Sequence, residues 1–191
     1  MINHHREGAG APLVLLHGIG LRWQINAPVI GRLAANFDVI ACDSPGFGDS
    51  PSLPDGVKPT IPAYADAFER FFAKERIERP HVAGNSMGGA IALELARRGV
   101  TASTTATSPA GFWTQAERRF CQLSLAALTQ TPSTARPALE ALARTRAGRT
   151  ALLWQTFGHP TRMPGEEVVA TWRVEDGVLL SDDVDSERID A

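Results

Sequence analysis

A serine set between glycines is the residue of this sequence best placed to do chemistry. Residues 84–89 read Gly-Asn-Ser-Met-Gly-Gly, which contains the pattern Gly-x-Ser-x-Gly. The stretch lies between a short apolar run and an amphipathic run, so Ser86 is predicted to occupy a sharp turn from a strand into a helix. Such a turn strains the serine backbone, and the residues two before and two after must be small, as Gly84 and Gly88 are. The pattern indicates a nucleophilic hydroxyl.

Alternating apolar runs predict the elements that position this serine. Short continuous runs indicate buried strands, and runs with apolar residues at helical spacing indicate helices between them. The strands are expected at residues 12–17, 37–43, 80–83 and 101–107, and the helices at residues 25–36, 60–72 and 90–98. Thr60 is a candidate helix cap with Pro62 just inside the helix. This order predicts an α/β fold, an open and mostly parallel sheet with flanking helices.

The pattern changes after residue 111, and three segments are expected. Residues 1–111 form the α/β core, and residues 112–173 carry short helices broken by prolines and a glycine, which predict a helical lid. Residues 174–191 hold seven acids and a single Arg, so this tail is expected to be poorly ordered. With 191 residues and 43% hydrophobic content, the chain is long enough for one good core.

Composition argues against several other classes of protein. The net charge is −2 and the cations are spread along the chain, so nucleic acid is not expected as a partner. No apolar stretch reaches bilayer length and no signal-peptide core follows Met1, so a cytoplasmic protein without a membrane segment is expected. Cys42 and Cys121 are isolated, which predicts no metal site and no disulfide. Gly46-x-Gly48 lacks a third glycine at Pro51, so no dinucleotide cofactor is expected.

Three motifs in a fixed order resemble those of the α/β-hydrolase family. Each follows a predicted strand: His-Gly-Ile-Gly at residues 17–20, Asp-Ser-Pro-Gly-Phe-Gly-Asp-Ser at residues 43–50, and Gly-Asn-Ser-Met-Gly-Gly at residues 84–89. Over residues 2–173 the chain resembles the lid-bearing serine hydrolases of this family. The third motif looks most like that of hydrolases that cleave carbon–carbon bonds of ring-fission products, and it also occurs in their esterase relatives. The motif does not separate these two activities.

The resemblance implies a role for each residue of the site. Ser86 would attack the carbonyl of a small-molecule acyl or ketone substrate, and the backbone N–H groups of Met87 and Ile19 would receive the oxyanion. Met87 opens the helix, so its N–H has no intrahelical acceptor. Gly18 and Gly20 allow the loop to turn without a Cβ clash, and His17 is interpreted as a positioning group rather than a base. No cofactor is implied.

Two further features each have a functional and a structural interpretation. Asp43 and Asp49 are expected to serve turns and hydrogen bonds rather than catalysis. The large aromatic residues of the lid segment are expected either to line an apolar acyl pocket or to form the lid core. They are Phe112, Trp113, Trp154, Phe157 and Trp172.

The sequence departs from the family where the acid and the histidine base of the triad should follow the lid. The histidines are His4, His5, His17, His81 and His159, and none is placed on Ser86 by the motifs. The abrupt acidic tail therefore indicates truncation or a reading-frame change near residue 173, and the residues do not separate these from a natural short form. Without later strands, the strand at residues 101–107 is expected to be a free sheet edge open to self-association. The alternative to a serine hydrolase is an incomplete hydrolase-like domain that binds a small apolar ligand or a partner.

Overall fold

The computed structural model describes residues 1–117, 119, 120, 123, 136–153, 173–175 and 178–180. The chain divides into two compact units, Met1–Thr114 and Gln115–Ala191. The first unit carries the motifs that the sequence singles out, and its end at Thr114 lies close to the core boundary expected at residue 111.

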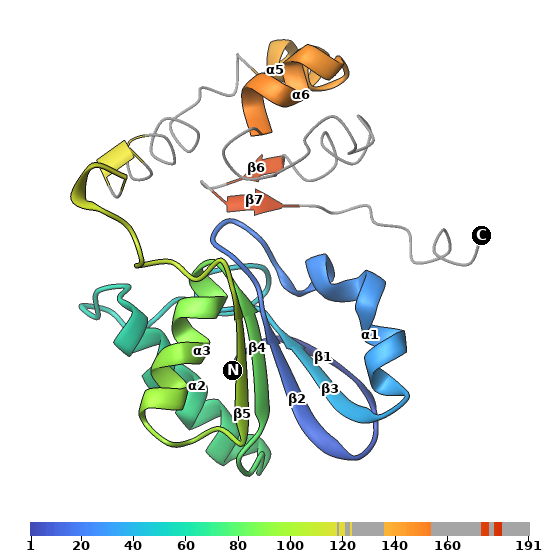
Figure 1. Ribbon diagram of the computed structural model, residues 1–191, viewed down its shortest axis with the longest axis vertical. Helices are drawn as coiled ribbons and strands as arrows, with labels where there is room; N and C mark the ends of the chain where they lie inside the picture. Colours follow the sequence, from blue (N-terminus) through green and yellow to red (C-terminus); the bar gives the residue numbers. More distant parts are fainter. Residues whose placement is uncertain (118, 121–122, 124–135, 154–172, 176–177, 181–191) are drawn as a thin grey trace. The chain divides into compact units, whose positions relative to one another are not determined.

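The first unit is built on a five-stranded sheet in the order β1-β3-β2-β4-β5 (Figure 1). Its strands are β1 (His4–Gly8), β2 (Ala11–Leu16), β3 (Phe37–Cys42), β4 (His81–Asn85) and β5 (Ser103–Thr107). β2 runs parallel to β3 and β4, and β4 runs parallel to β5, which confirms the predicted open and mostly parallel sheet. Among the described residues β5 pairs with β4 alone, so it forms one edge of the sheet.

The other edge is β1, a strand that the sequence analysis does not predict. It pairs antiparallel with β3, with Arg6 opposite Ile40. The Arg6 guanidinium holds the Asp38 carboxylate at the start of β3 through two bonds, Nη2 to Oδ2 at 2.6 Å and Nε to Oδ1 at 2.9 Å. A paired guanidinium and carboxylate restrict geometry, so this pair adds a side-chain contact to the backbone pairing of a strand whose own residues are mostly polar.

Helices cover both faces of the sheet, and side-chain alternation along the strands separates two cores. Leu13, Leu15, Val39 and Ala41 face α1 (Ala27–Ala34), which buries Ile30 against them. The intervening strand residues face α2 (Ile61–Glu75) and α3 (Met87–Arg97) on the opposite side, as Figure 1 shows. The buried residues of this second core include Val14, Leu16, Ile40, Phe68, Val82, Ile91 and Leu95. Successive side chains along each strand thus enter opposite cores, as expected for strands that are buried on both faces of the sheet.

The start of α2 follows the predicted signals. The Thr60 side chain accepts a hydrogen bond from the Ala63 N–H at 3.3 Å, and a proline occupies the first turn. The predicted helix at residues 25–36 is divided, because Trp23–Asn26 forms a 3-10 turn and α1 begins at Ala27. Pro28 lies in the first turn of α1, where its missing N–H costs nothing.

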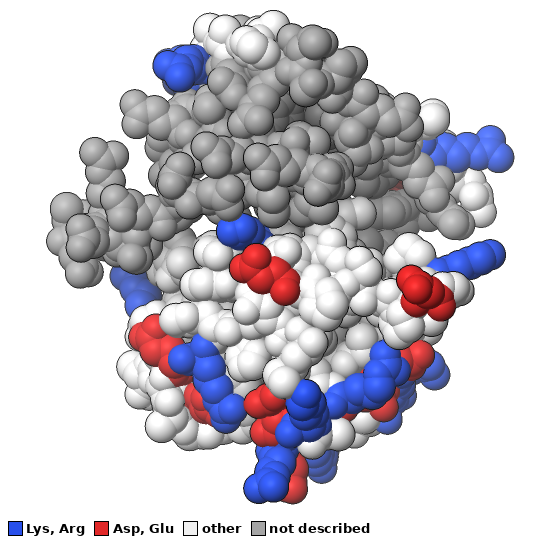
Figure 2. All heavy atoms as spheres, turned by 180° about the vertical axis from the view of Figure 1, so that it is seen from behind, with Lys and Arg blue, Asp and Glu red and all other residues white. Residues whose placement is uncertain are grey.

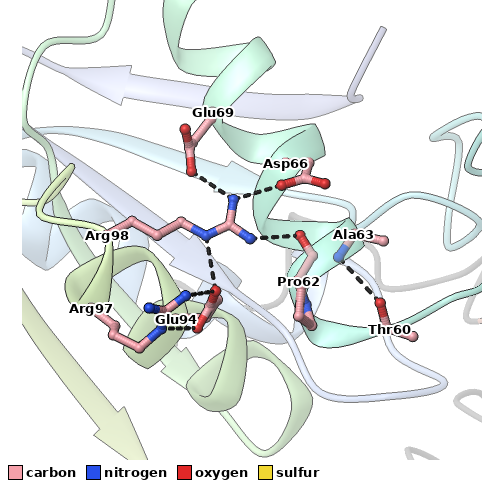
Figure 3. A network of polar contacts seen from close by, with 8 residues as sticks. All are labelled: Thr60, Pro62, Ala63, Asp66, Glu69, Glu94, Arg97 and Arg98. Carbon is pink, nitrogen blue, oxygen red and sulfur yellow. Dashed lines mark hydrogen bonds and ion pairs between the residues drawn. The ribbon is translucent and has the colours of Figure 1, made fainter.

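Arg98 ties α3 to α2 through a set of ion pairs (Figure 3). Its guanidinium lies 2.6 Å from Asp66 and 2.8 Å from Glu69 on α2, and its Nε donates to Glu94 at 2.9 Å. Hydrogen bonds from Arg97 and then Arg98 lower the pKa of Glu94 to about 2. The two helices therefore meet at a charged contact outside their apolar core. Figure 2 shows cationic and anionic side chains interspersed on one face of the molecule.

The second unit contains two described helices and a small sheet. α5 (Arg136–Ala143) and α6 (Arg146–Leu153) fall within the segment predicted to be a helical lid. The side chain of Arg149 turns back to donate to the carbonyl oxygens of Ala143 and Arg144 at 3.1 and 2.9 Å, at the end of α5. A position of this unit over Ser86 stays a prediction.

A short antiparallel pair follows the helices in sequence. β6 (Arg173–Glu175) pairs with β7 (Val178–Leu180). The pair includes residues of the segment for which the sequence predicts a poorly ordered tail, and residues 181–191 lie outside the described residues. In the part of the chain that the structure describes, no helix combines the length and the apolar character needed to cross a bilayer.

Candidate active site

Ser86 lies at the junction of β4 and α3 with a backbone that serine rarely adopts. Its φ is 53° and its ψ is −115°, on the positive-φ side that disfavours a residue with a Cβ. The surrounding backbone holds this conformation: the Ser86 N–H donates to the Thr107 carbonyl at 3.0 Å, and the Ser86 carbonyl accepts from Ala110 at 3.0 Å and Ala90 at 3.1 Å. The serine thus stands at the carboxyl end of the parallel strands, where active sites of open α/β sheets are found.

Close packing explains the two glycines that flank Ser86. A Cβ at Gly84 would overlap the backbone of Gly88, and a Cβ at Gly88 would overlap the carbonyl groups of Leu16 and His17. Neither glycine is among the residues with positive φ, so the requirement is for space rather than for a left-handed backbone. These contacts let α3 start directly against the end of β2.

The loop after β2 passes beside the serine. A Cβ built on Gly18 would lie 3.3 Å from the Ser86 Cβ, and Gly20 has a φ of 73°, which favours glycine. Ile19 lies between them with a side chain that is 49% exposed, while Met87 opens α3 and is buried. The first helical N–H groups point out of the helix end without intrahelical acceptors. The structure therefore brings together Ser86, Met87 and the loop that contains Ile19.

His17 is fully engaged beneath this loop. The Ser44 N–H donates to His17 Nε2 at 2.9 Å, so the proton is assigned to Nδ1, which donates to the Gly18 carbonyl at 2.7 Å. The ring is 1% exposed, and burial lowers the pKa of His17 in spite of the opposing Gly18 carbonyl and Asp43 carboxylate. A neutral imidazole with both nitrogens occupied fits the predicted positioning group and cannot accept the Ser86 proton.

The Asp43 carboxylate organises the second motif. It is buried and accepts three hydrogen bonds: from the Trp23 N–H at 2.7 Å, from the Asn3 side chain at 2.7 Å and from the Asp49 N–H at 3.1 Å. A Cβ at Gly48 would overlap this carboxylate, so the loop can close tightly around it only with glycine there. The arrangement agrees with the structural role expected for Asp43, since every contact fixes a backbone or a neighbouring amide.

The other described histidines have partners away from the serine. His4 Nδ1 contacts the Ile2 carbonyl at 3.2 Å, His5 Nε2 contacts Glu7 at 3.2 Å, and His81 Nδ1 contacts Ser103 at 2.7 Å. His159 lies outside the described residues. Among the described histidines, none is therefore placed as a base for Ser86.

The aromatic and cysteine predictions are only partly covered by the described residues. Phe112 and Trp113 are exposed at 77% and 43%. Cys42 is buried with a free thiol whose pKa burial raises strongly. Trp154, Phe157, Trp172 and Cys121 lie outside the described residues. In the described ranges no group of three or more His, Cys, Asp or Glu side chains is arranged to hold a metal ion.

The sequence analysis does not predict the roles of Asn85 and Thr107, which connect the turn at Ser86 to the end of β5. Asn85 Nδ2 donates to the Thr107 carbonyl at 3.3 Å, and Thr107 Oγ1 donates to the Gly84 carbonyl at 3.3 Å. Together with the Ser86–Thr107 backbone bond, they make the end of β5 part of the site. The pairing of β4 with β5, Asn85 opposite Thr107, produces these contacts, and no local pattern carries that register.

Comparison with known proteins gives the class to which this architecture belongs. The sequence model of the Alpha/beta hydrolase family matches residues 13–187, and the chain belongs to this family. A hydrolase of known structure from Pseudomonas aeruginosa PA01 superposes with a TM-score of 0.61 at 18% identity, covering 88% of this chain and 65% of that one. At this identity the likeness shows a shared fold.

Several curated proteins match in sequence, among them an acetyltransferase component and an esterase. The dihydrolipoyllysine-residue acetyltransferase component of the acetoin cleaving system of Cupriavidus necator is 36% identical over 117 residues, 58% of this chain and 30% of the relative. The pimeloyl-[acyl-carrier protein] methyl ester esterase of Aeromonas hydrophila is 35% identical over 95 residues, 50% of this chain and 35% of the relative. The chain thus spans about a third of the length of these relatives.

Proposed function

We propose that this chain carries the nucleophile and the oxyanion site of a serine hydrolase that acts on small-molecule carboxylic esters. The observation that carries the proposal is the backbone of Ser86, held at a φ of 53° by bonds to Thr107 and Ala110 between two glycines that admit no side chain. Strain of about 1–3 kcal/mol persists only where the surroundings enforce it, and it collects at functional sites. Family membership and the matched esterase support the same reaction class.

In this mechanism Ser86 Oγ attacks the ester carbonyl carbon and the carbonyl oxygen becomes an oxyanion. The N–H groups of Met87 and Ile19 donate to that oxygen, and the positive end of α3 adds to the stabilisation. Collapse of the intermediate breaks the bond to the alcohol oxygen, which takes up the proton lost from the Ser86 hydroxyl. Water then adds to the acyl-serine, its hydroxyl stays with the released acid and its other proton restores the Ser86 hydroxyl. The described histidines do not supply the base for these proton transfers, because each contacts another partner.

Carbon–carbon bond cleavage in ring-fission products is a second reaction that the Gly-Asn-Ser-Met-Gly-Gly motif admits. It would use the same oxyanion site on a ketone carbonyl. Comparing turnover of p-nitrophenyl esters with that of a vinylogous diketone acid separates the two reactions, and we expect the esters to be the better substrates.

A binding domain without catalysis is the alternative from a different class. It is favoured by one observation, that His17 has both ring nitrogens occupied and the other described histidines lie elsewhere. In such a domain the site would bind a small apolar ligand or a partner and leave it unchanged.

Intact-mass measurement after treatment with a fluorophosphonate probe decides between these functions. The native chain should gain one adduct, the Ser86→Ala variant should gain none, and the Ser52→Ala variant, which removes an exposed serine outside the motif, should label like the native chain. A native chain that stays unmodified would support the binding alternative and contradict the hydrolase proposal.

A further inference from the structure

A hollow of about 290 Å³ lies on the first unit, lined in part by the residues before β1, and Ser86 is not among its lining residues. Most of its lining residues are apolar, and the apolar lining, called the floor below, includes Ile2, Pro51, Leu53 and Phe71. Ile2 and Phe71 belong to the buried core on the α2 side of the sheet, and Leu53 packs against that core. The hollow is therefore an opening onto the hydrophobic core.

Two cationic side chains and no acidic side chain line this hollow. Arg70 and Lys74 lie one helical turn apart on α2, and the other lining residues are apolar apart from Ser52. In the part of the chain that the structure describes, neither Arg70 nor Lys74 forms an ion pair. Like charges at this spacing repel each other, and an anion between them relieves the repulsion. The hollow is locally cationic in a chain whose net charge is −2.

The loop that forms one wall is fixed before any ligand arrives. Ser50 Oγ donates to the Asp43 carbonyl at 2.8 Å and accepts from the Asn3 N–H at 2.8 Å, and the Gly46 N–H donates to the Pro51 carbonyl at 3.1 Å. A preformed wall removes much of the ordering cost of binding.

The hollow is distinct from the Ser86 site. Its walls come from the residues before β1, the loop after β3 and α2, whereas Ser86 follows β4, and β2 lies between β3 and β4 in the sheet. Occupation of one site therefore leaves the other open.

We propose that this hollow binds the anion of a short linear alkanoic acid, with the alkyl chain on the apolar floor and the carboxylate between Arg70 and Lys74. An apolar floor selects a hydrocarbon chain, paired cations select a carboxylate, and the Ser52 hydroxyl adds a donor at the same wall. A free inorganic anion would leave the floor exposed to water, and a neutral alcohol would leave the cations without a counter-charge.

Calorimetric titration of the full chain with hexanoate, octanoate, octan-1-ol and octyltrimethylammonium tests this site. Octanoate should bind most tightly, and each methylene added between hexanoate and octanoate should tighten binding about fourfold. The Arg70→Gln/Lys74→Gln variant should weaken octanoate binding about three- to tenfold without changing octan-1-ol binding. A matched variant, Arg32→Gln/Lys58→Gln, removes the same charge elsewhere and should bind like the native chain.

Two further variants locate the ligand. Leu53→Asp places a carboxylate on the floor and should abolish octanoate binding, whereas Ser86→Ala should leave it unchanged. The proposal is overturned if octanoate does not bind, if octan-1-ol binds equally well, if the two charge variants behave alike, or if Ser86→Ala abolishes binding.

Discussion

Replacing the buried Asp43 carboxylate is expected to destabilise the first unit strongly. Asp43 is 1% exposed and accepts from Trp23, Asn3 and Asp49. A hydrogen bond to a charged group contributes about 1.5–3 kcal/mol, and bonds that share one acceptor group are not additive. We therefore expect Asp43→Ala to lower the free energy of unfolding by about 3–5 kcal/mol, a large part of the stability of an ordinary domain.

Asp43→Asn tests the same reasoning with almost no change in volume. One carboxylate oxygen serves the Trp23 N–H and the other serves both Asn3 and Asp49, so an amide must turn its NH₂ group toward at least one donor. The expected loss is about 1–3 kcal/mol. Urea unfolding followed by far-UV circular dichroism and tryptophan fluorescence measures it, with the exposed Asp55→Asn as control. An Asp43→Asn midpoint equal to that of Asp55→Asn would refute the assignment.

Four further predictions concern the site residues Gly88, His17 and Ser86 and the sheet edge formed by β5. Gly88→Ala should lower stability by about 1–3 kcal/mol through overpacking, measured by thermal unfolding. The pKa of His17 is lower in the folded chain than in the unfolded chain, so below about pH 6.5 the unfolded chain binds a proton that the folded chain does not. The free energy of unfolding should therefore fall as pH drops below about 6.5. Denaturant titrations from pH 8 to 5.5 should show this fall, and His17→Gln should reduce it. Hydrolysis of p-nitrophenyl acetate should be slow and reduced further by Ser86→Ala; ordinary enzyme rates would show that a base is present. Light scattering should detect self-association of the native chain through the sheet edge at β5, and Thr105→Lys should reduce it. A native chain that stays strictly monomeric would contradict this prediction.

The parts of the fold that the sequence predicts are those with local signals. The runs that end at His17, Asp43 and Ala83 correspond to β2, β3 and β4 with boundaries shifted by one or two residues, because buried parallel strands are continuous apolar stretches. The turn at Ser86 is predicted because it requires glycines at fixed positions, and these are visible in the sequence. The structure gives the reason: a Cβ at either glycine would overlap backbone a few residues away or in the neighbouring strand.

The parts that the sequence does not predict depend on partners far along the chain. β1 contains His-His-Arg-Glu-Gly, which has no strand pattern, and its contacts are the backbone pairing with β3 and the Arg6–Asp38 ion pair. The hydrogen bonds of His17 and Thr107 likewise join separate strand ends. A histidine tautomer or a strand register of this kind is a tertiary property that residue types alone do not encode.

The attachment of Ser86 to Thr107 makes the nucleophile sensitive to fraying of an edge strand. The last residue of β5 accepts the Ser86 N–H, and β5 has a single strand neighbour among the described residues. Edge elements open locally at lower free energy than the centre of a sheet. The Ser86 amide should therefore exchange its hydrogen with solvent through local opening of β5, and it should be less protected than the Leu15 amide in central β2. Ligands or partners that clamp β5 would slow this exchange and hold the serine in its strained conformation for longer.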